Sequence, residues 1–298
     1  MMLDRMEGNA ELKTSVQQML ATRRLTHSVL LVGEAGLGTG FAARCIAADY
    51  LYPAGGAAAE ALLRGECCRA VAKAGKRDSG TVETGIVREA ISVSGMGSGG
   101  KYLVGQVTAM RSEIFNTSLS AEGRAVLLYH VERMNEESAN ALLKVMEEPP
   151  EGVLFLLTAD SLASVLPTIR SRCVSFAVAP VSPADCTRYC AAQGVDKKTA
   201  ALYSELFDGH IGTVLAVARD EARAAQVEKA LELAPRPRFT DPVNAIAQLY
   251  EIQGQYEKAI EFYQKEIEIV REDWNETQGE AIDEPLRNIA RLKEKMIK

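Results

Sequence analysis

The 298-residue sequence lacks any apolar stretch that approaches the roughly 20 residues needed to span a bilayer. Its first residues, MMLDRMEGNAELK, contain no apolar core of the kind found in secretory signals. A basic excess is also missing, because 34 lysines and arginines stand against 40 acidic residues, a net charge of −6. These absences argue against a membrane protein, a secreted protein and a chain that alone grips nucleic acid over a large surface.

Six cysteines are present, but they do not form a disulfide framework in the sequence: Cys45, Cys67, Cys68, Cys173, Cys186 and Cys190. Cys186 and Cys190 lie one helical turn apart, and helix packing explains them better than a metal site. We therefore predict free thiols, no metal ligands and a reducing cytoplasm as the compartment.

The central stretch, residues 123–173, predicts two buried strands with a helix between them. Residues 125–128 and 153–157 are continuous apolar runs, which are typical of strands covered on both faces. Asn135 is expected to cap the intervening helix, because its short polar side chain accepts N–H groups of the first turn. The segment LPTIRSRC follows the second strand and ends in an exposed loop.

A glycine-rich segment, GEAGLGTG, follows the predicted strand Ser28–Val32 and precedes a helical pattern. Strand, glycine-rich turn and helix is the context of a phosphate-binding loop, in which backbone N–H groups and the helix dipole hold the phosphate. A working loop ends in lysine, which neutralises the phosphates, and in serine or threonine, whose hydroxyl holds Mg²⁺. Thr39 and Gly40 occupy these two positions here. The segment predicts the shape of the loop without its charge or its metal ligand.

The motifs NEESANALLKVMEEPP, VLFLLTAD and LPTIRSRC together resemble the clamp-loader branch of the AAA+ ATPases, and within it the bacterial DNA polymerase III delta-prime subunits. The resemblance extends from about Gly8 to about Leu215. It implies an α/β fold with a RecA-like parallel sheet domain, a small helical lid and an all-helical C-terminal segment. The corresponding domains would be residues 1–179, 180–225 and 226–298.

The same resemblance implies a nucleotide site that has lost its chemistry in three separate places, of which Thr39 and Gly40 are the first. Tyr129 and His130 stand where an active relative has acidic residues, and Thr213 stands where it has an arginine. Thr158 matches the family's sensor position, and with no nucleotide expected it is better explained as a strand-end hydrogen-bonding group. His130 alone makes no metal site. The candidate positions of this degenerate site are Gly33, Gly36, Gly38, Thr39, Gly40, Tyr129, His130, Thr158 and Thr213.

Members of the family usually carry a four-cysteine zinc module within the region that corresponds to residues 53–100. This sequence offers only Cys67 and Cys68 there, and adjacent thiols do not close a tetrahedral zinc shell. We interpret the module as lost and expect no cofactor of the chain's own, with ATP and Mg²⁺ bound by neighbouring subunits. A basic cluster, Lys73, Lys76 and Arg77, fits a solvated loop, with a phosphate contact as the alternative. In the turn before the first strand, Thr26 replaces the usual proline.

The tripeptide Ser171-Arg172-Cys173 is the most specific element of the resemblance. The family presents this arginine to the ATP of a neighbouring subunit, which implies a catalytic role in trans for Arg172 and an interface at Ser171, Arg172 and Cys173. The alternative interpretation is an exposed arginine in a surface ion pair.

A different resemblance appears at residues 244–270, which look like one tetratricopeptide repeat. The signature positions are Tyr250, Gly254, Tyr256, Ala259, Ile260 and Tyr263. About three such repeats are usually needed for a stable array. The segment therefore predicts either a helical hairpin within an oligomerisation collar or a peptide-binding repeat, with residues 282–297 as a capping helix.

The favoured hypothesis is a non-catalytic, delta-prime-like subunit of a hetero-oligomeric clamp loader, acting with ATPase subunits, the delta subunit, a sliding clamp and primed DNA. One alternative is an active AAA+ clamp-loader ATPase, which the missing lysine and acidic residues disfavour. A second alternative is a scaffold that acts through the repeat-like C-terminal segment, which the intact tripeptide disfavours.

Overall fold

A computed structural model describes residues 1–22, 27–74, 79–116, 123–233, 255–273 and 280–297, together with Ala247 and Glu251. The chain separates into two compact units, Met1–Ala224 and Ala225–Lys298. In chain order the elements are η1 (Met2–Arg5), α1 (Ala10–Ala21), β1 (Ser28–Val32), α2 (Thr39–Leu51), α3 (Ala57–Leu63), β2 (Cys67–Ala72), β3 (Gly80–Glu83), β4 (Val87–Ser94), η2 (Ser98–Gly100), α4 (Val104–Asn116), β5 (Arg124–Tyr129), η3 (Val131–Arg133), α5 (Glu136–Glu147), β6 (Val153–Ala159), η4 (Leu162–Ser164), α6 (Pro167–Arg170), β7 (Val174–Ala177), α7 (Pro183–Ala192), α8 (Lys197–Leu206), α9 (Ile211–Ala218), α10 (Glu221–Leu233), α12 (Tyr256–Asp273) and α13 (Glu280–Ile297).

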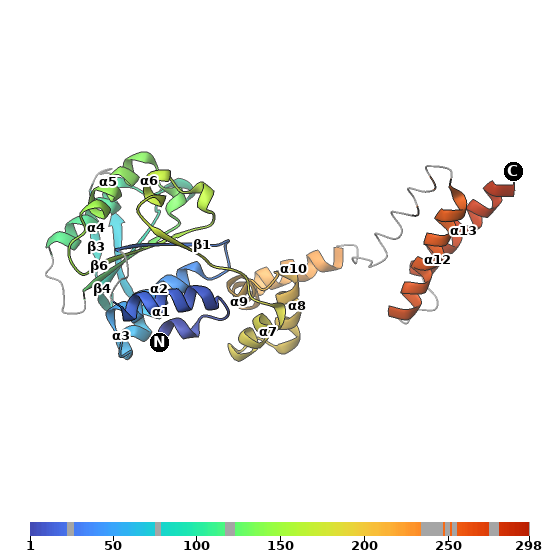
Figure 1. Ribbon diagram of the computed structural model, residues 1–298, viewed down its shortest axis with the longest axis horizontal. Coiled ribbons are helices and arrows are strands. Elements are labelled where there is room, and N and C mark those ends of the chain that lie inside the picture. Colours follow the sequence, from blue (N-terminus) through green and yellow to red (C-terminus); the bar gives the residue numbers. More distant parts are fainter. Residues whose placement is uncertain are drawn as a thin grey trace. The chain divides into compact units, whose positions relative to one another are not determined.

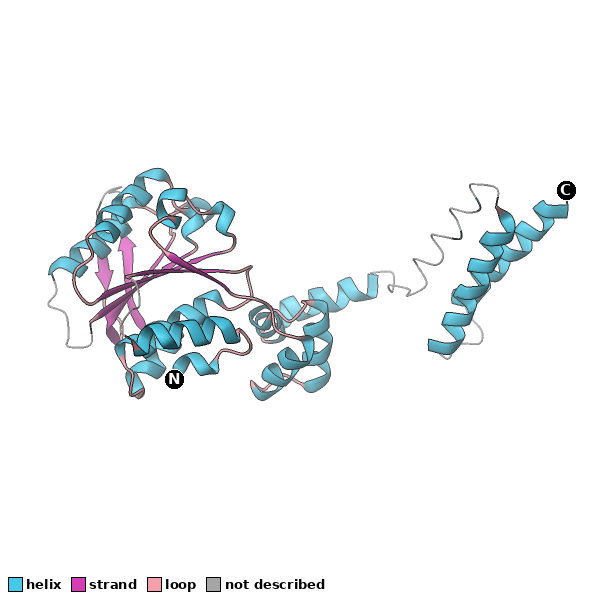
Figure 2. Ribbon diagram, in the orientation of Figure 1, coloured by secondary structure: helices cyan, strands magenta, loops and turns pink. Residues whose placement is uncertain are grey.

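A seven-stranded sheet forms the centre of the first unit, in the order β3-β2-β4-β5-β6-β1-β7 (Figure 2). Neighbouring strands run parallel except for β3, which pairs antiparallel with β2 at one edge. The carboxyl ends of β1, β5 and β6 therefore lie at one end of the sheet. Side chains that follow these strands are brought together there, which is where parallel sheets bind ligands.

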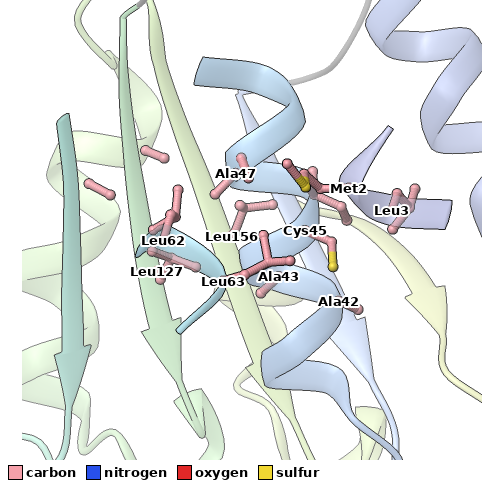
Figure 3. Close-up of a cluster of buried hydrophobic side chains, with 14 of the residues drawn as sticks. Met2, Leu3, Ala42, Ala43, Cys45, Ala47, Leu62, Leu63, Leu127 and Leu156 are labelled. Carbon is pink, nitrogen blue, oxygen red and sulfur yellow. The ribbon is translucent and has the colours of Figure 1, made fainter. Parts of the chain in front are cut away.

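Helices cover both faces of the sheet, with α1, α2 and α3 on one face and α4, α5 and α6 on the other (Figure 1). Side chains alternate along β1, so that Val29 and Leu31 join the core under the first group and Leu30 joins the core under the second. Figure 3 shows Ala43 and Ala47 of α2 on the side of Leu127 and Leu156 in the sheet, and Cys45 on the opposite side of the helix, toward Met2 and Leu3.

The local signals predicted in the central stretch are observed. β5 and β6 coincide with the apolar runs, and nearly all of their residues are buried. Asn135 caps α5, because its Oδ1 accepts a hydrogen bond from the backbone N–H of Ser138 at 2.9 Å. Ser182 caps α7 in the same way, and Pro183 follows it in the first helical turn.

The region of residues 53–100, to which the sequence analysis assigned no helix or strand, contributes α3, β2, β3 and β4 to the folded unit. Cys67 and Cys68 are both buried in β2 and project to opposite faces of the sheet, one into each core. This geometry prevents the two thiols from holding one ion. Lys76 and Arg77 lie outside the described residues, as do residues 23–26 of the turn before β1.

Three short helices, α7, α8 and α9, follow the sheet within the first unit, and Cys186 and Cys190 are buried in α7 with their sulfurs 4.0 Å apart. In the second unit α12 packs against α13 around Tyr263, Ile267 and Leu292. Of the repeat signature, Tyr250 and Gly254 lie outside the described residues, as do residues 235–242. The predicted α/β fold, with a mostly parallel sheet, a small helical part and a helical C-terminal segment, is confirmed, whereas the exact domain boundaries stay predictions.

None of the helices in the described ranges combines the length and the apolarity that crossing a bilayer requires.

Candidate functional site

The glycine-rich turn leaves the sheet at the end of β1 and enters α2. The backbone N–H of Gly33 donates to the carbonyl of Ala159 at 3.0 Å, which places the start of the turn beside the end of β6. Gly36 and Gly38 have φ of 93° and 90°, a conformation that L side chains rarely adopt, and Gly38 directly precedes α2. Strand, glycine-rich turn and helix therefore follow one another in the order that the sequence indicates, with Thr39 as the first helical residue.

The ring of Tyr129 lies against Gly40. A Cβ atom at Gly40 would lie 3.3 Å from Cε1 of Tyr129, so a serine or threonine side chain there would crowd the ring. Tyr129 packs on the same core as α2, and burial raises the pKa of its phenol, which stays neutral at physiological pH. At this position an acidic side chain would be needed to hold Mg²⁺, and a neutral ring fills it instead.

The start of α9 contacts the same glycine-rich turn, at Gly36. The backbone N–H of Gly212, in the first turn of α9, donates to the carbonyl of Gly36 at 2.8 Å. A Cβ atom at Gly36 would overlap Oγ1 of Thr213. The side chain of Thr213 thus lies on the turn itself, and this contact joins α9 directly to the turn. His210 and Glu34 also approach across this boundary, with Nε2 and Oε2 3.6 Å apart.

His130 directly follows β5 and adopts the left-handed conformation, with φ of 58°. Its backbone N–H donates to Oγ1 of Thr158 at 3.1 Å, so Thr158 acts as a hydrogen-bonding group between the ends of β5 and β6. Its ring Nδ1 lies 3.2 Å from Oε1 of Glu132 and 3.4 Å from Oδ1 of Asp160. Sequence reasoning considered His130 by itself and missed the two carboxylates beside it. The available signal was their position just after the predicted strands, because parallel strand ends meet.

The tripeptide Ser171-Arg172-Cys173 connects the short helix α6 to β7. Arg172 donates from Nη2 to Oε1 of Glu147 at 2.6 Å, and from Nη1 to the carbonyl of Thr168 at 3.1 Å. Its side chain is 37% exposed and that of Glu147 is 51% exposed, so the ion pair faces solvent. Burial raises the pKa of the Cys173 thiol to about 12, which keeps the thiol protonated and unreactive at neutral pH.

The structure separates the two groups of predicted residues. In the parallel pair β1–β7, Val174 lies opposite Val29 and Ala177 lies opposite Val32. Ser171, Arg172 and Cys173 therefore precede the strand at one end of the sheet, whereas the turn that begins at Gly33 follows it at the other. Arg172 therefore cannot reach the glycine-rich turn of its own chain unless the order or register of the strands changes.

Comparison with known proteins shows which family this arrangement belongs to. The family model described as "DNA polymerase III, delta subunit" matches residues 8–182, more than half of the chain. DNA polymerase III subunit delta' of Bacillus subtilis is 25% identical over 232 residues, covering 78% of this chain and 61% of that protein. Subunit delta' of Pseudomonas aeruginosa is 30% identical over 206 residues, covering 68% and 58%. Subunit gamma of Buchnera aphidicola is 26% identical over 175 residues, covering 59% and 44%.

The chain thus spans less than two thirds of the length of these curated relatives. Among solved structures, the RuvB Holliday junction branch migration motor of Thermotoga maritima aligns at 14% identity, covering 90% of this chain and 77% of that one with a TM-score of 0.46. A DNA polymerase III gamma subunit-related protein of the same organism aligns at 14% identity, covering 94% and 90% with a TM-score of 0.39. On the match to residues 8–182, the chain belongs to the DNA polymerase III delta-subunit family and resembles its delta' members.

Proposed function

We propose that this chain is a non-catalytic clamp-loader subunit that supplies Arg172 to the ATP of a neighbouring ATPase subunit. The observation that carries the proposal is the position of the tripeptide, at the opposite end of the sheet from the chain's own glycine-rich turn. An arginine at that end serves a ligand held by another molecule. Ser171 and Cys173 would flank it at the contact with that neighbour.

The chemistry of the residue suits this role. A guanidinium is permanently charged and planar, and it forks onto two oxygens of a phosphoryl group as charge shifts during transfer. The ion pair with Glu147 does not oppose this role, because an exposed pair contributes about 0–1 kcal/mol and opens readily. If the guanidinium of Arg172 leaves Glu147 to contact a phosphate, it is paired with an anion both before and after the change.

Three features of the glycine-rich turn support the absence of ATP hydrolysis by the chain alone. Thr39 replaces the lysine, the ring of Tyr129 occupies the space over Gly40, and Thr213 contacts the turn where an arginine would reach a nucleotide. The transition state of phosphoryl transfer would have neither a cation nor a metal ligand from these positions. This arrangement disfavours the alternative of an active ATPase.

The remaining assignments belong to the same proposal. Residues 180–225 would act as the lid, and residues 226–298 as an oligomerisation collar or a tetratricopeptide-like hairpin. The partners would be the ATPase subunits and the delta subunit, with a sliding clamp and primed DNA engaged by the whole assembly in the cytoplasm. ATP and Mg²⁺ would be held by the neighbours.

The test is Arg172→Ala in a loader reconstituted from the full chain and its partner subunits. We expect normal assembly by gel filtration, with ATP hydrolysis at the neighbouring site slowed by up to ~10³- to 10⁵-fold, the range known for arginines supplied in trans. Arg172→Lys should restore little of the hydrolysis rate, because lysine carries the same charge but cannot bind two oxygens at once as the planar guanidinium does.

The matched control is Arg170→Ala, which removes an exposed arginine two residues away and should leave hydrolysis unchanged. Normal hydrolysis and clamp loading with Arg172→Ala, or an equal loss with Arg170→Ala, would show that Arg172 has no catalytic role.

A further inference from the structure

Three potential metal ligands converge where β5 and β6 end: His130, Glu132 and Asp160. Nδ1 of His130 lies 3.2 Å from Oε1 of Glu132 and 3.4 Å from Oδ1 of Asp160, and the three ligand atoms all lie within 4.8 Å of one another. The proposed function assigns no ligand to this cluster, and it is separate from the buried thiols of Cys67 and Cys68.

One oxygen of the Glu132 carboxylate is buried without a hydrogen-bond partner among the described residues. This oxygen is Oε2, and the side chain of Glu132 is only 12% exposed. Arg133 approaches the other oxygen, with its Nε 3.8 Å from Oε1. A buried carboxylate oxygen that accepts no hydrogen bond carries its full desolvation penalty, which a directly bound cation would offset.

Two of the three separations between the ligand atoms fit one ion. Ligand atoms that bind a tetrahedral ion at about 2.0–2.2 Å lie about 3.3–3.6 Å from one another. The observed separations from His130 Nδ1, 3.2 and 3.4 Å, are close to that range. The main chain at His130 is held beside the end of β6, because its N–H donates to Oγ1 of Thr158.

We propose that His130, Glu132 and Asp160 bind one Zn²⁺ ion. A site with one imidazole nitrogen and two carboxylate oxygens suits zinc, whereas Mg²⁺ and Ca²⁺ prefer oxygen ligands alone. The side chains of His130 and Asp160 are 40% and 41% exposed, so the remaining coordination position is open to water or to an anionic ligand.

A bound ion would join the carboxyl ends of two neighbouring strands. Glu132 belongs to η3, directly after β5, and Asp160 directly follows β6. Binding to the folded chain alone raises its stability in proportion to the logarithm of the ion concentration. The site should therefore make the melting temperature of the full chain depend on zinc.

The test uses the full chain, stripped of metal with a chelator and titrated with Zn²⁺ by calorimetry, with the melting temperature measured at each ratio. We expect one equivalent to bind and the melting temperature to rise. His130→Asn and Asp160→Asn should each weaken binding by about tenfold or more, since even residues that only orient a metal ligand contribute that much. Asparagine suits position 130 because it tolerates the left-handed conformation.

Two controls separate this site from adventitious binding. His210→Asn removes a histidine that lies near a single carboxylate, and Cys67→Ala combined with Cys68→Ala removes the adjacent thiols. Both should bind zinc like the parent chain. The proposal is overturned if the parent chain binds no zinc, if His130→Asn and Asp160→Asn bind it as tightly as the parent, or if a control variant loses binding to the same extent.

Discussion

The glycine-rich turn of residues 33–40 and the tripeptide Ser171-Arg172-Cys173 lie at opposite ends of the same pair of strands and differ in what each retains. The turn has the glycines that a phosphate-binding loop needs, and the side chains of Thr213 and Tyr129 pack against it at Gly36 and Gly40. The tripeptide contains an exposed arginine, whose side chain makes an ion pair with Glu147 and hydrogen bonds to Thr168 and Ser171 at the surface.

The turn and the tripeptide are stabilised by different kinds of interaction. The turn is stabilised by close steric packing. An atom added at Gly36 would overlap Thr213, and such overpacking destabilises the folded state. A solvent-exposed ion pair is weak and opens without disturbing its surroundings. Substitutions should therefore cost folding stability at the turn and cost little at the tripeptide.

The largest effect on stability is expected for Gly36→Ala. Its φ of 93° disfavours any Cβ, which costs roughly 1–2 kcal/mol, and overlap with Oγ1 of Thr213 adds about 1–3 kcal/mol of overpacking. The free energy of unfolding, measured by urea denaturation, should fall by the sum of the two costs.

Gly194→Ala is the matched control for this substitution. Gly194 has a similar φ of 89°, but a Cβ atom there would meet nothing within 4 Å. It should show the conformational cost alone. Equal losses of stability in the two variants would mean that the contact between Thr213 and the turn contributes nothing.

A smaller effect is expected for Gly40→Thr, which restores the hydroxyl residue of a working loop. Its side chain crowds the ring of Tyr129, whereas leaving glycine favours the helix, so we expect a net loss on the order of 1 kcal/mol in the free energy of unfolding. In a Tyr129→Ala background the same substitution should cost less, and the difference measures the coupling between the two positions. Additive effects, with no coupling, would contradict the steric account.

Much of the fold could be predicted from the sequence, because the strongest local signals agree with the packing. The continuous apolar runs of β5 and β6 leave no alternative to burial on both faces, and Asn135 and Ser182 have the side chains that cap helices. The strand β2, CCRAVA, gave no such signal, since its alanines are poor strand formers and are held in the sheet by pairing with the neighbouring strands β3 and β4.

The contacts that define the candidate sites were harder to predict, because they join residues distant in sequence. Glu147 reaches Arg172 across 25 positions, and Asp160 reaches His130 across 30. A residue pattern identifies the side chains that follow each strand but not the rotamers that bring them together. The missing lysine at Thr39 was visible in the sequence, whereas the filling of the space by Tyr129 required the structure.

The smallest effect is expected for Glu147→Gln, which removes the partner of Arg172 while keeping the shape of the side chain. Because the ion pair is exposed, the free energy of unfolding should change by less than about 1 kcal/mol. In the reconstituted loader ATP hydrolysis should persist, since the proposed role requires Arg172 to leave Glu147 for a phosphate. The neighbouring exposed residue gives a control, Glu148→Gln, with the same change of charge and no effect expected on either measurement. If Glu147→Gln destabilised the chain as strongly as Gly36→Ala, the arginine would be a structural residue and the contrast between the two ends of the sheet would fail.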